Sequence, residues 1–391
     1  MSASSTGADE TELTDLRSAV RSLCERFPGP YWQALDESRR YPEEFVRALS
    51  ESGYLAVLIP QEFGGAGGTL MEASVILEEI HHSGGNASAC HAQMYTMGTL
   101  LRHGSQEQKE RFLPRLARGE IRLQSFAVTE PSAGSDTLNL STTATREGDE
   151  YVVTGQKIWT SRVQHSDLMM LLVRTAPPAT VQDRRDGLSV FLVDLHEALT
   201  KGMTVRPIRT MLNHETNEVF FDRLRIPASA LVGKEGQGFS YILDGMNAER
   251  ILIAAECIGD GYWFVDHASD YARERVVFGR PIGANQGIAF PLARSYMSVR
   301  AADLMRVRAA NLFDDGLDCG AEANMAKLLA SEASWEAANA AIQTFGGYGF
   351  AAEFDVERKF RETRLYQVAP ISSNLILAYL AHHALKLPRS Y

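Results

Sequence analysis

Cysteine is scarce in this chain, with only four in 391 residues. They are Cys24, Cys90, Cys257 and Cys319, and no two of them form a CxxC pair. Disulfide frameworks and structural zinc sites both need cysteines at short, regular spacings. The sequence therefore excludes both devices and predicts reduced thiols, as in a cytosol.

Segments that would target or anchor the chain are also missing. The N-terminal stretch MSASSTGADETELTDL has neither a positively charged start nor an apolar centre, so it does not match a secretory signal. Arg17 is the first arginine and follows several acids, which argues against a mitochondrial transit peptide. No apolar run approaches the roughly 20 residues that span a bilayer. We expect a soluble cytoplasmic protein without a membrane span.

Positive charge is in deficit, and the formal net charge is −10. Nucleic-acid binding needs a basic face, so we expect no nucleic-acid partner. The Gly233–Gly238 run has the wrong glycine spacing for a dinucleotide loop and lacks the lysine-serine ending of a P-loop. His81-His82 does not form an HExxH motif, so the sequence predicts no metal site.

The composition is that of an ordinary globular protein, with 45% hydrophobic and 23% charged residues. A chain of this length predicts two or three domains. Residues 1–122 read as a helical domain. Phe45, Val46 and Leu49 recur at helical spacing within residues 36–53, and Ser105 to Gln108 resembles a capping box that opens a further helix.

Residues 123–235 change to short β-type runs without intervening helices, which predicts a barrel or sandwich-like domain. Gly148-Asp149-Glu150 is typical of a hairpin turn. The expected strands are Gln124–Thr129, Tyr151–Trp159, Leu168–Val173, Leu188–Leu195 and Glu218–Phe221.

Residues 236–391 are helical again, with clear periodicity over 250–272 and 321–342. Gly346, Gly347 and Gly349 interrupt this pattern. The predicted fold class is therefore α+β: an N-terminal helical domain, a middle β domain and a C-terminal helical bundle.

Two motifs in the β region combine small hydroxyl residues with glycine or tryptophan. The first, residues 126–136, reads FAVTEPSAGSD, and its glycine lets the backbone approach a ligand closely. Taken alone, it is more typical of a capped turn after a strand. The second, residues 155–161, reads GQKIWTS. Its tryptophan could cover a flat ring or simply anchor the β core.

Two further motifs lie in the C-terminal region. Residues 274–281 read ERVVFGRP, and Gln286 follows closely. Arg275 could pair with a pyrophosphate while Phe278 stacks on an adenine, although arginine clusters are more often solvated helix faces. Residues 343–350 read QTFGGYGF, which on its own is also typical of a glycine C-cap.

Together these motifs resemble the acyl-CoA dehydrogenase family over roughly residues 40 to 385. The strongest match is TEPSAGSD at 129–136, followed by the arginine motifs within 249–286 and the QxxGGxG pattern at 343–349. The resemblance implies FAD as cofactor and an acyl thioester as substrate. It also implies a homo-oligomer, typically a tetramer, and an electron acceptor that is either an electron-transfer flavoprotein or oxygen.

The resemblance further implies roles for individual residues. Residues 126–135 and 159–161 would flank the flavin ring, and residues around Arg275 would bind the adenine and pyrophosphate of FAD from a neighbouring subunit. Ser161 stands where many members have threonine and keeps the hydroxyl. The cofactor residues so assigned are Phe126, Val128, Thr129, Ser135, Trp159, Thr160, Ser161, Arg275, Phe278, Gln286, Gln343, Gly346, Gly347, Ser372 and Asn374. The substrate residues are Ser135, Asn247, Arg250 and His91.

One position departs from the family pattern. Pro370 stands where most members have the glutamate that removes the α-proton. Proline has no carboxylate, and it also lacks the N–H that would help to hold the thioester oxygen. Some members place the base directly before the arginine matched here by Arg250, so Glu249 is the predicted base, and the β-hydrogen would pass to flavin N5. The N–H of Ile371, the N–H of Ala369 or the flavin ribityl hydroxyl could hold the oxygen instead.

Several alternatives stay open at this stage. His91 could face the acyl pocket and favour a polar or short acyl group, while Met94 and Met97 fit ordinary core packing. The acyl carrier could be coenzyme A or an acyl carrier protein. Without a standard base, the chain could also be a flavin monooxygenase, an elimination enzyme or a non-catalytic flavoprotein.

Overall fold

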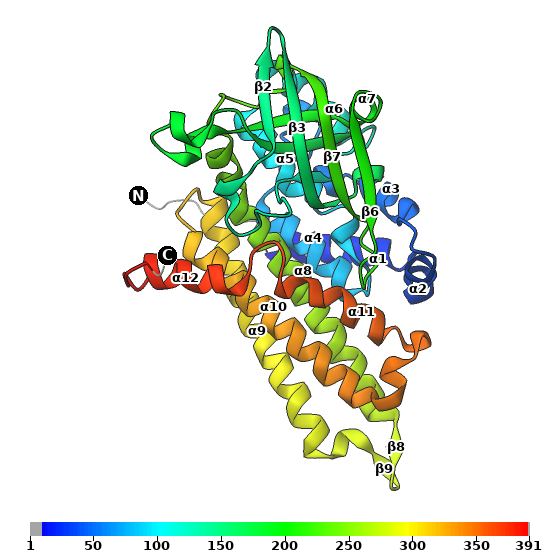
Figure 1. Cartoon of the computed structure of the whole chain (residues 1–391). Helices are drawn as coiled ribbons and strands as arrows, with labels where there is room; N and C mark the ends of the chain where they lie inside the picture. The colour runs from blue at the N-terminus through cyan, green and yellow to red at the C-terminus, as the bar shows by residue number, and fades with distance from the viewer. Residues whose placement is uncertain (1–9, 390–391) are drawn as a thin grey trace. The chain divides into compact units, whose positions relative to one another are not determined.

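The computed structural model describes residues 10–389, in which helices, a sheet and further helices follow one another along the chain (Figure 1). This order confirms the predicted fold class. In the described range, no helix combines the length and apolarity that a bilayer crossing requires. The three domains predicted as 1–122, 123–235 and 236–391 stay a prediction.

The chain forms two compact units that interleave in sequence. Of the described residues, the first unit, here called the helical unit, contains 10–40, 69–87 and 247–389, and the second, the sheet unit, contains 41–68 and 88–246. Helix α8 contributes residues to both. The helices of the helical unit are α1 (Glu10–Cys24), α2 (Gly29–Ser38), α4 (Leu70–His82), α8 (Gly238–Glu274), α9 (Gln286–Asp314), α10 (Gly320–Phe345), α11 (Val356–Thr363) and α12 (Ser373–His383).

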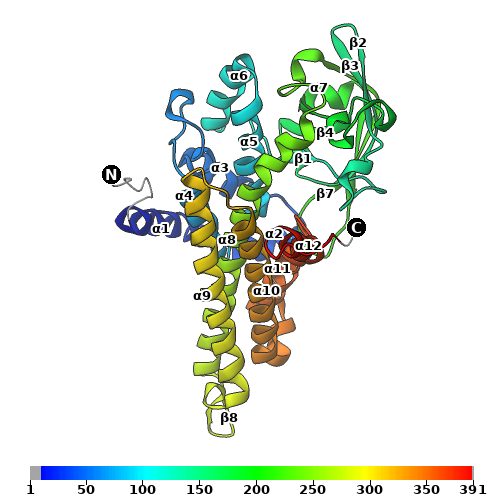
Figure 2. The same cartoon turned by 90° about the vertical axis from the view of Figure 1, so that its left-hand side faces the viewer.

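Long helices form the core of the helical unit. Figures 1 and 2 show α8, α9 and α10 running side by side. One apolar cluster joins Phe264 of α8, Leu292 of α9 and Ala338 of α10. The many alanines of α10 allow neighbouring helices to approach closely, and their burial stabilises the unit by roughly 25 cal/mol for each Å² removed from water.

A seven-stranded sheet forms the core of the sheet unit, in the order β1-β4-β2-β3-β7-β6 with β5 paired to β4. Figure 1 shows β2, β3, β7 and β6 side by side. The strands are β1 (Ser125–Ala127), β2 (Thr143–Glu147), β3 (Glu150–Ser161), β4 (Leu168–Arg174), β5 (Leu188–Asp194), β6 (Met203–Ile208) and β7 (Thr216–Pro227). The helices are α3 (Glu43–Glu51), α5 (Ala92–His103), α6 (Gln106–Ala117) and α7 (Leu195–Thr200).

The five predicted strands correspond to β1, β3, β4, β5 and β7, whereas β2 and β6 were not predicted. Both missed strands are mostly exposed and carry few buried apolar side chains, so their sequences show little alternation. The predicted hairpin turn is confirmed, since Gly148 joins β2 to β3 with a φ of 66°.

Two helix predictions can also be compared with the structure. The capping box at Ser105 is confirmed, because its side chain accepts from the Gln108 N–H and the Gln108 side chain accepts in return from the Ser105 N–H. The helical spacing of Phe45, Val46 and Leu49 is confirmed, because all three are buried on α3, which covers only part of residues 36–53. The chain breaks between α2 and α3, since Arg39 adopts a φ of 51° and Pro42 has no N–H to continue a helix.

Candidate active site

Glu249 lies on α8 together with two of the residues predicted to contact substrate, Asn247 and Arg250. Its side chain is buried, with 8% exposure. The neighbouring Arg250 donates from Nη1 to Asn247 Oδ1 at 3.0 Å, while its buried Nε has no protein partner within residues 10–389. Burial lowers the pKa of Arg250, and the Glu249 carboxylate opposes that shift. The structure therefore brings Asn247, Glu249 and Arg250 together in one cluster.

The face of α8 that carries Glu249 also carries two fully buried carboxylates, Glu256 and Asp260. With 3.6 residues per turn, Glu256 and Asp260 each lie within about 20° of Glu249 around the helix axis, one on either side of it. The Tyr366 hydroxyl donates to Glu256 Oε2 at 2.8 Å. His81 Nδ1 lies 2.8 Å from Asp260 Oδ1, and His81 Nε2 accepts from a backbone N–H, so Nδ1 carries the proton.

Lysine 327 anchors the segment that contains Pro370, here called the 366–371 segment. Its Nζ donates to the carbonyl oxygen of Tyr366 at 2.7 Å and to that of Ile371 at 3.1 Å. The Lys327 side chain is fully buried, and this burial lowers its pKa. Both acceptors belong to the main chain, so the ammonium fixes the course of the backbone on each side of Pro370.

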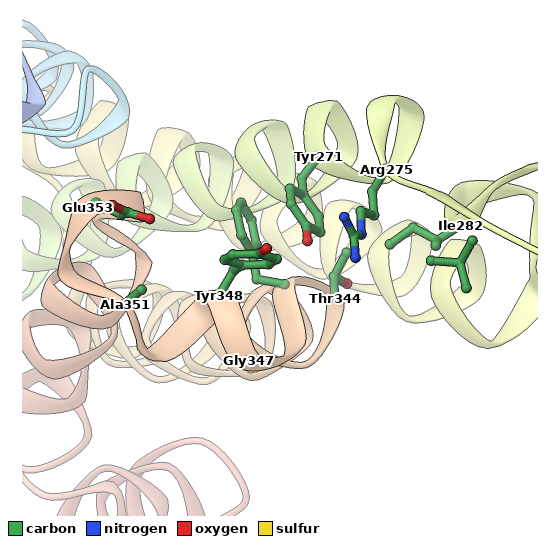
Figure 3. A pocket seen from close by; sticks show the side chains of 10 residues that line it. Tyr271, Arg275, Ile282, Thr344, Gly347, Tyr348, Ala351 and Glu353 are labelled. Carbon is green, nitrogen blue, oxygen red and sulfur yellow. The ribbon is translucent and has the colours of Figure 1, made fainter.

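A cavity of about 600 Å³ lies at the other end of the helical unit, where α8 leads into the hairpin of β8 (Val276–Val277) and β9 (Arg280–Pro281). In Figure 3, Tyr271 on α8 and Arg275 directly after α8 face Thr344 and Tyr348. The Arg275 guanidinium lies 5.7 Å from the centre of the Tyr348 ring. Within residues 10–389 it has no carboxylate partner. An uncompensated guanidinium beside an aromatic ring fits a ligand that combines a phosphate with a flat base.

Only some of the residues predicted to bind the nucleotide line this cavity. Arg275 and Gly347 line it, whereas Phe278, Gln286 and Gln343 do not. Phe278 is fully exposed at the tip of the hairpin, with a φ of 50°. Gly346 ends α10 with a φ of 59°. Gln286 opens α9, Ser372 caps α12 by accepting from the Leu375 N–H, and Asn374 is exposed on the first turn of α12.

The two motifs of the sheet unit lie side by side, and a buried ion pair joins them. Lys157 of β3 donates to the Val128 carbonyl and to Glu130 Oε1, each at 2.9 Å. Burial alone would raise the pKa of Glu130, but Lys157, together with hydrogen bonds from Thr142 and Ser141, lowers it to about 2. This pair fixes the loop after β1 against β3.

Trp159 stands at an irregularity of β3, where the register against β7 shifts between Lys157 and Thr160. Its φ is 62°, and its side chain is 57% exposed. A bulge of this kind re-aims a side chain away from the strand's regular alternation. The adjacent Thr160 hydroxyl is buried and has no protein partner within residues 10–389. An exposed indole beside an unsatisfied hydroxyl fits a flat ligand with polar edges.

The remaining predicted residues of the sheet unit vary in exposure. Ser135 is exposed, Ser161 is half-buried, and Phe126, Val128 and Thr129 are half-buried at the end of β1 or just after it. The Thr129 carbonyl accepts from the Ile158 N–H at 2.9 Å, which brings the two motifs into contact a second time.

His91 lies just before α5, which begins at Ala92 after a short 3-10 turn over Ala87–Ala89. The imidazole centre is 5.7 Å from the Tyr95 ring, and the Tyr95 ring is 6.4 Å from Phe126 of β1. Burial holds the pKa of the nearby His214 well below its ordinary value. The charge interaction with His91 also lowers this pKa, by a smaller amount. Met94 and Met97 are both buried.

Sequence reasoning missed the residues that support the site. Lys327, Glu256 and Tyr366 form contacts between segments about 40 to 110 positions apart in sequence. Their one signal is chemical, since charged residues within apolar helical stretches are rarely buried without a partner. That signal marks a buried ion or hydrogen bond but does not identify the partner.

Three family models match the chain. They are the N-terminal domain of acyl-CoA dehydrogenase over residues 10–120, the middle domain over 125–224 and the C-terminal domain over 236–382. The chain is 36% identical to the acyl-CoA dehydrogenase FadE12 of Mycobacterium tuberculosis (strain ATCC 25618 / H37Rv), over 98% of both chains.

Two solved structures are also similar. A glutaryl-coenzyme A dehydrogenase in complex with glutaryl-CoA superposes with a TM-score of 0.91 and 29% identity, over 98% of both chains. The prolyl acyl carrier protein oxidase AnaB superposes with a TM-score of 0.88 and 25% identity, over 97% of this chain and 100% of that one.

Proposed function

Because this chain belongs to the acyl-CoA dehydrogenase family, whose members are oxidoreductases that act on CH–CH groups, we propose that it dehydrogenates an acyl thioester at its α,β-carbons. FAD is the proposed cofactor. Membership of a fold family does not by itself assign a reaction, so the proposal rests on this chain's own residues. The observation that carries it is the buried Glu249 carboxylate, on the α8 face that also bonds to Tyr366 through Glu256.

Glu249 is the proposed base. Removal of a proton next to a thioester requires a positioned carboxylate in a site closed to water. Pro370 has no ionisable group, while Glu249 is buried and lies beside Asn247 and Arg250. In this proposal the α-proton moves to the Glu249 carboxylate. The unpartnered Nε of Arg250 remains free to donate to a ligand.

Each unit has its own proposed cofactor residues. Bound FAD would supply the acceptor for the β-hydrogen, which leaves as hydride. Trp159 would cover the ring, and the Thr160 and Ser161 hydroxyls would bond to its edge. Phe126, Val128, Thr129 and Ser135 are assigned to the same ring, and Ser372 and Asn374 to the cofactor as well.

The cavity beside Arg275 would hold the adenine and pyrophosphate of FAD from a neighbouring subunit. Arg275 supplies the cation, Tyr348 supplies an aromatic face, and Gly347 keeps the wall open. The same role is proposed for Phe278, Gln286, Gln343 and Gly346. This arrangement needs a homo-oligomer, and we propose a tetramer. The exposed apolar side chains of Met297 and Leu304 on α9 support such an assembly.

Substrate and partners belong to the same proposal. His91, buried near His214, favours a short or polar acyl group over a long alkyl chain. The proposed carrier is coenzyme A or an acyl carrier protein. Of the two similar structures named above, one is a glutaryl-coenzyme A dehydrogenase and the other is a prolyl acyl carrier protein oxidase. An electron-transfer flavoprotein or oxygen would reoxidise the cofactor.

A second candidate function follows from Pro370. A chain with neither a carboxylate nor an N–H at this position is also compatible with a flavin monooxygenase, an elimination enzyme or a non-catalytic flavoprotein. A flavin monooxygenase and a non-catalytic flavoprotein need no α-proton base. The fate of the reduced flavin in air separates them from a dehydrogenase.

The test is an anaerobic titration of the FAD-loaded protein with short, branched and aromatic acyl thioesters, following flavin absorbance. Parent protein is compared with Glu249→Gln, which removes the base, and with Glu249→Asp, which keeps a carboxylate on a shorter side chain. We expect bleaching in the parent, slower bleaching in Glu249→Asp and none in Glu249→Gln.

Other results would redirect the assignment. Equal bleaching in the parent and in Glu249→Gln would place the base elsewhere. No bleaching by any thioester, with fast oxygen consumption once the flavin is chemically reduced, would favour the monooxygenase. Retained FAD with neither activity would favour a non-catalytic flavoprotein.

A further inference from the structure

Loss of an α-proton places negative charge on the thioester oxygen, so this oxygen needs a hydrogen-bond donor. In the 366–371 segment most donors are absent or occupied. Pro370 has no N–H, and the N–H groups of Val368 and Ala369 both bond to the Leu365 carbonyl at 3.0 Å. The Ile371 N–H has no protein acceptor within residues 10–389, and its residue is only half-buried.

The position of Ile371 is fixed by the buried ammonium of Lys327. Its two bonds end on the carbonyls of Tyr366 and Ile371, on either side of Pro370. Moving the segment would leave this fully buried charge without an acceptor, which is strongly unfavourable. The Ile371 carbonyl is therefore held in place before any ligand arrives, and the N–H of the same residue is positioned through it.

The same segment is tied to the helix that carries the proposed base. Tyr366 bonds to Glu256, and Glu249 lies about 10 Å before Glu256 on the same face of α8, at 1.5 Å per residue. Arg250, next to Glu249, is close enough to Lys327 to lower its pKa further. Glu249, Arg250 and the anchored segment thus belong to one region of the helical unit.

We propose that the Ile371 N–H receives the thioester oxygen and that Lys327 is the positioning residue that presents it. This inference rests on the proposed dehydrogenation. In the proton-transfer step the α C–H bond breaks, its proton passes to the Glu249 carboxylate, and the electron pair moves onto the oxygen bound by Ile371. The N–H donor is thus one residue later in the chain than the backbone N–H that a glutamate at position 370 would have.

The test compares Ile371→Pro with Ile371→Ala. Both remove the isoleucine side chain, but only proline also removes the N–H, so their difference reports on the donor. The probe is the panel thioester that reduces the parent flavin fastest. We expect flavin reduction in Ile371→Pro to be on the order of 100-fold slower than in Ile371→Ala, the usual effect of deleting one such donor.

A second measurement separates a direct contact from a structural effect. The carbonyl stretch of the bound thioester, labelled with ¹³C, should fall in frequency on binding to Ile371→Ala and fall much less in Ile371→Pro. A thioether with CH₂ in place of the carbonyl should bind equally to both variants. A smaller frequency shift is also expected in Lys327→Met, with partial recovery in Lys327→Arg, while FAD content stays constant.

Equal reduction rates and equal carbonyl shifts in the two Ile371 variants would overturn the donor assignment while leaving the dehydrogenase intact. If Ile371→Pro does not fold, an unchanged carbonyl shift in Lys327→Met would overturn the positioning role, and a reduced shift would support it. If no thioester reduces the parent flavin, the proposed function fails, and this inference fails with it.

Discussion

The hydroxyl of Tyr366 donates a 2.8 Å hydrogen bond to the carboxylate of Glu256, and both side chains are almost completely buried. This bond connects the turn before Pro370 to the helix that carries Glu249. A buried carboxylate that loses a donor keeps its desolvation penalty, so the bond matters more than its net strength in water suggests.

Tyr366→Phe should therefore destabilise the protein. We expect a loss of about 1–3 kcal/mol in the free energy of unfolding, because Glu256 loses the Tyr366 donor inside the core. Urea unfolding followed by circular dichroism measures it. The matched control is Tyr296→Phe, at a half-exposed position on α9, where the change should stay below about 0.5 kcal/mol. Equal effects at the two positions would contradict the structural role of this bond.

Introducing a glutamate at position 370 should compensate in part for the loss of Glu249. In the Glu249→Gln background, Pro370→Glu adds a carboxylate and an N–H in the anchored segment. We expect partial recovery of thioester-dependent flavin bleaching in the double variant. Rapid-reaction absorbance of parent, single and double variants measures it. A double variant as inactive as Glu249→Gln would show that the segment cannot present a base from this position.

Removal of Arg275 should weaken cofactor retention. The guanidinium lines the cavity without a carboxylate partner in the described chain, so a bound pyrophosphate would be its main partner. Loss of one charged hydrogen bond predicts about a 10- to 100-fold higher Kd for FAD in Arg275→Ala. Fluorescence of released FAD on dilution measures it.

The control for this prediction is Arg280→Ala on the same hairpin. Arg280 is exposed and donates to Asn285 at 2.7 Å, outside the cavity wall. Its removal changes net charge by the same amount. If both variants retain FAD equally well, the cavity is not the nucleotide site.

Glu130 should make stability depend on acidic pH. Its pKa falls from 4.5 to about 2 in the folded protein, because Lys157 and the hydrogen-bond donors outweigh burial. The folded state thus binds fewer protons than the unfolded state between these values. The stabilisation, at most about 3 kcal/mol, is present above pH 4.5 and is lost as the pH falls toward 2.

Thermal unfolding of parent and Glu130→Gln across pH 2 to 7 measures this effect. The difference in stability between the two proteins should be largest near neutral pH and should shrink as the solution becomes acidic. A difference independent of pH would show that the carboxylate does not titrate as the Lys157 contact requires.

The sequence predicted the order of helices and strands, because hydrophobic periodicity is a local property. The site residues on α8 came from the family resemblance, and their roles stay predictions. Sequence reasoning failed where structure depends on distant partners. Strands β2 and β6 are held mainly by pairing with β3 and β7, not by apolar alternation of their own. The anchor formed by Lys327 joins segments that no spacing rule connects. The roles of Phe278, Gln286 and Gln343 remain predictions.

The anchoring of the 366–371 segment has a consequence for how such an enzyme can change. Lys327 grips only main-chain oxygens, which every amino acid supplies. The side chain at position 370 can therefore change, even from a carboxylate to a proline ring, while the segment keeps both hydrogen bonds to Lys327. A scaffold held in this way can relocate a catalytic group from a loop to a helix without first being rebuilt.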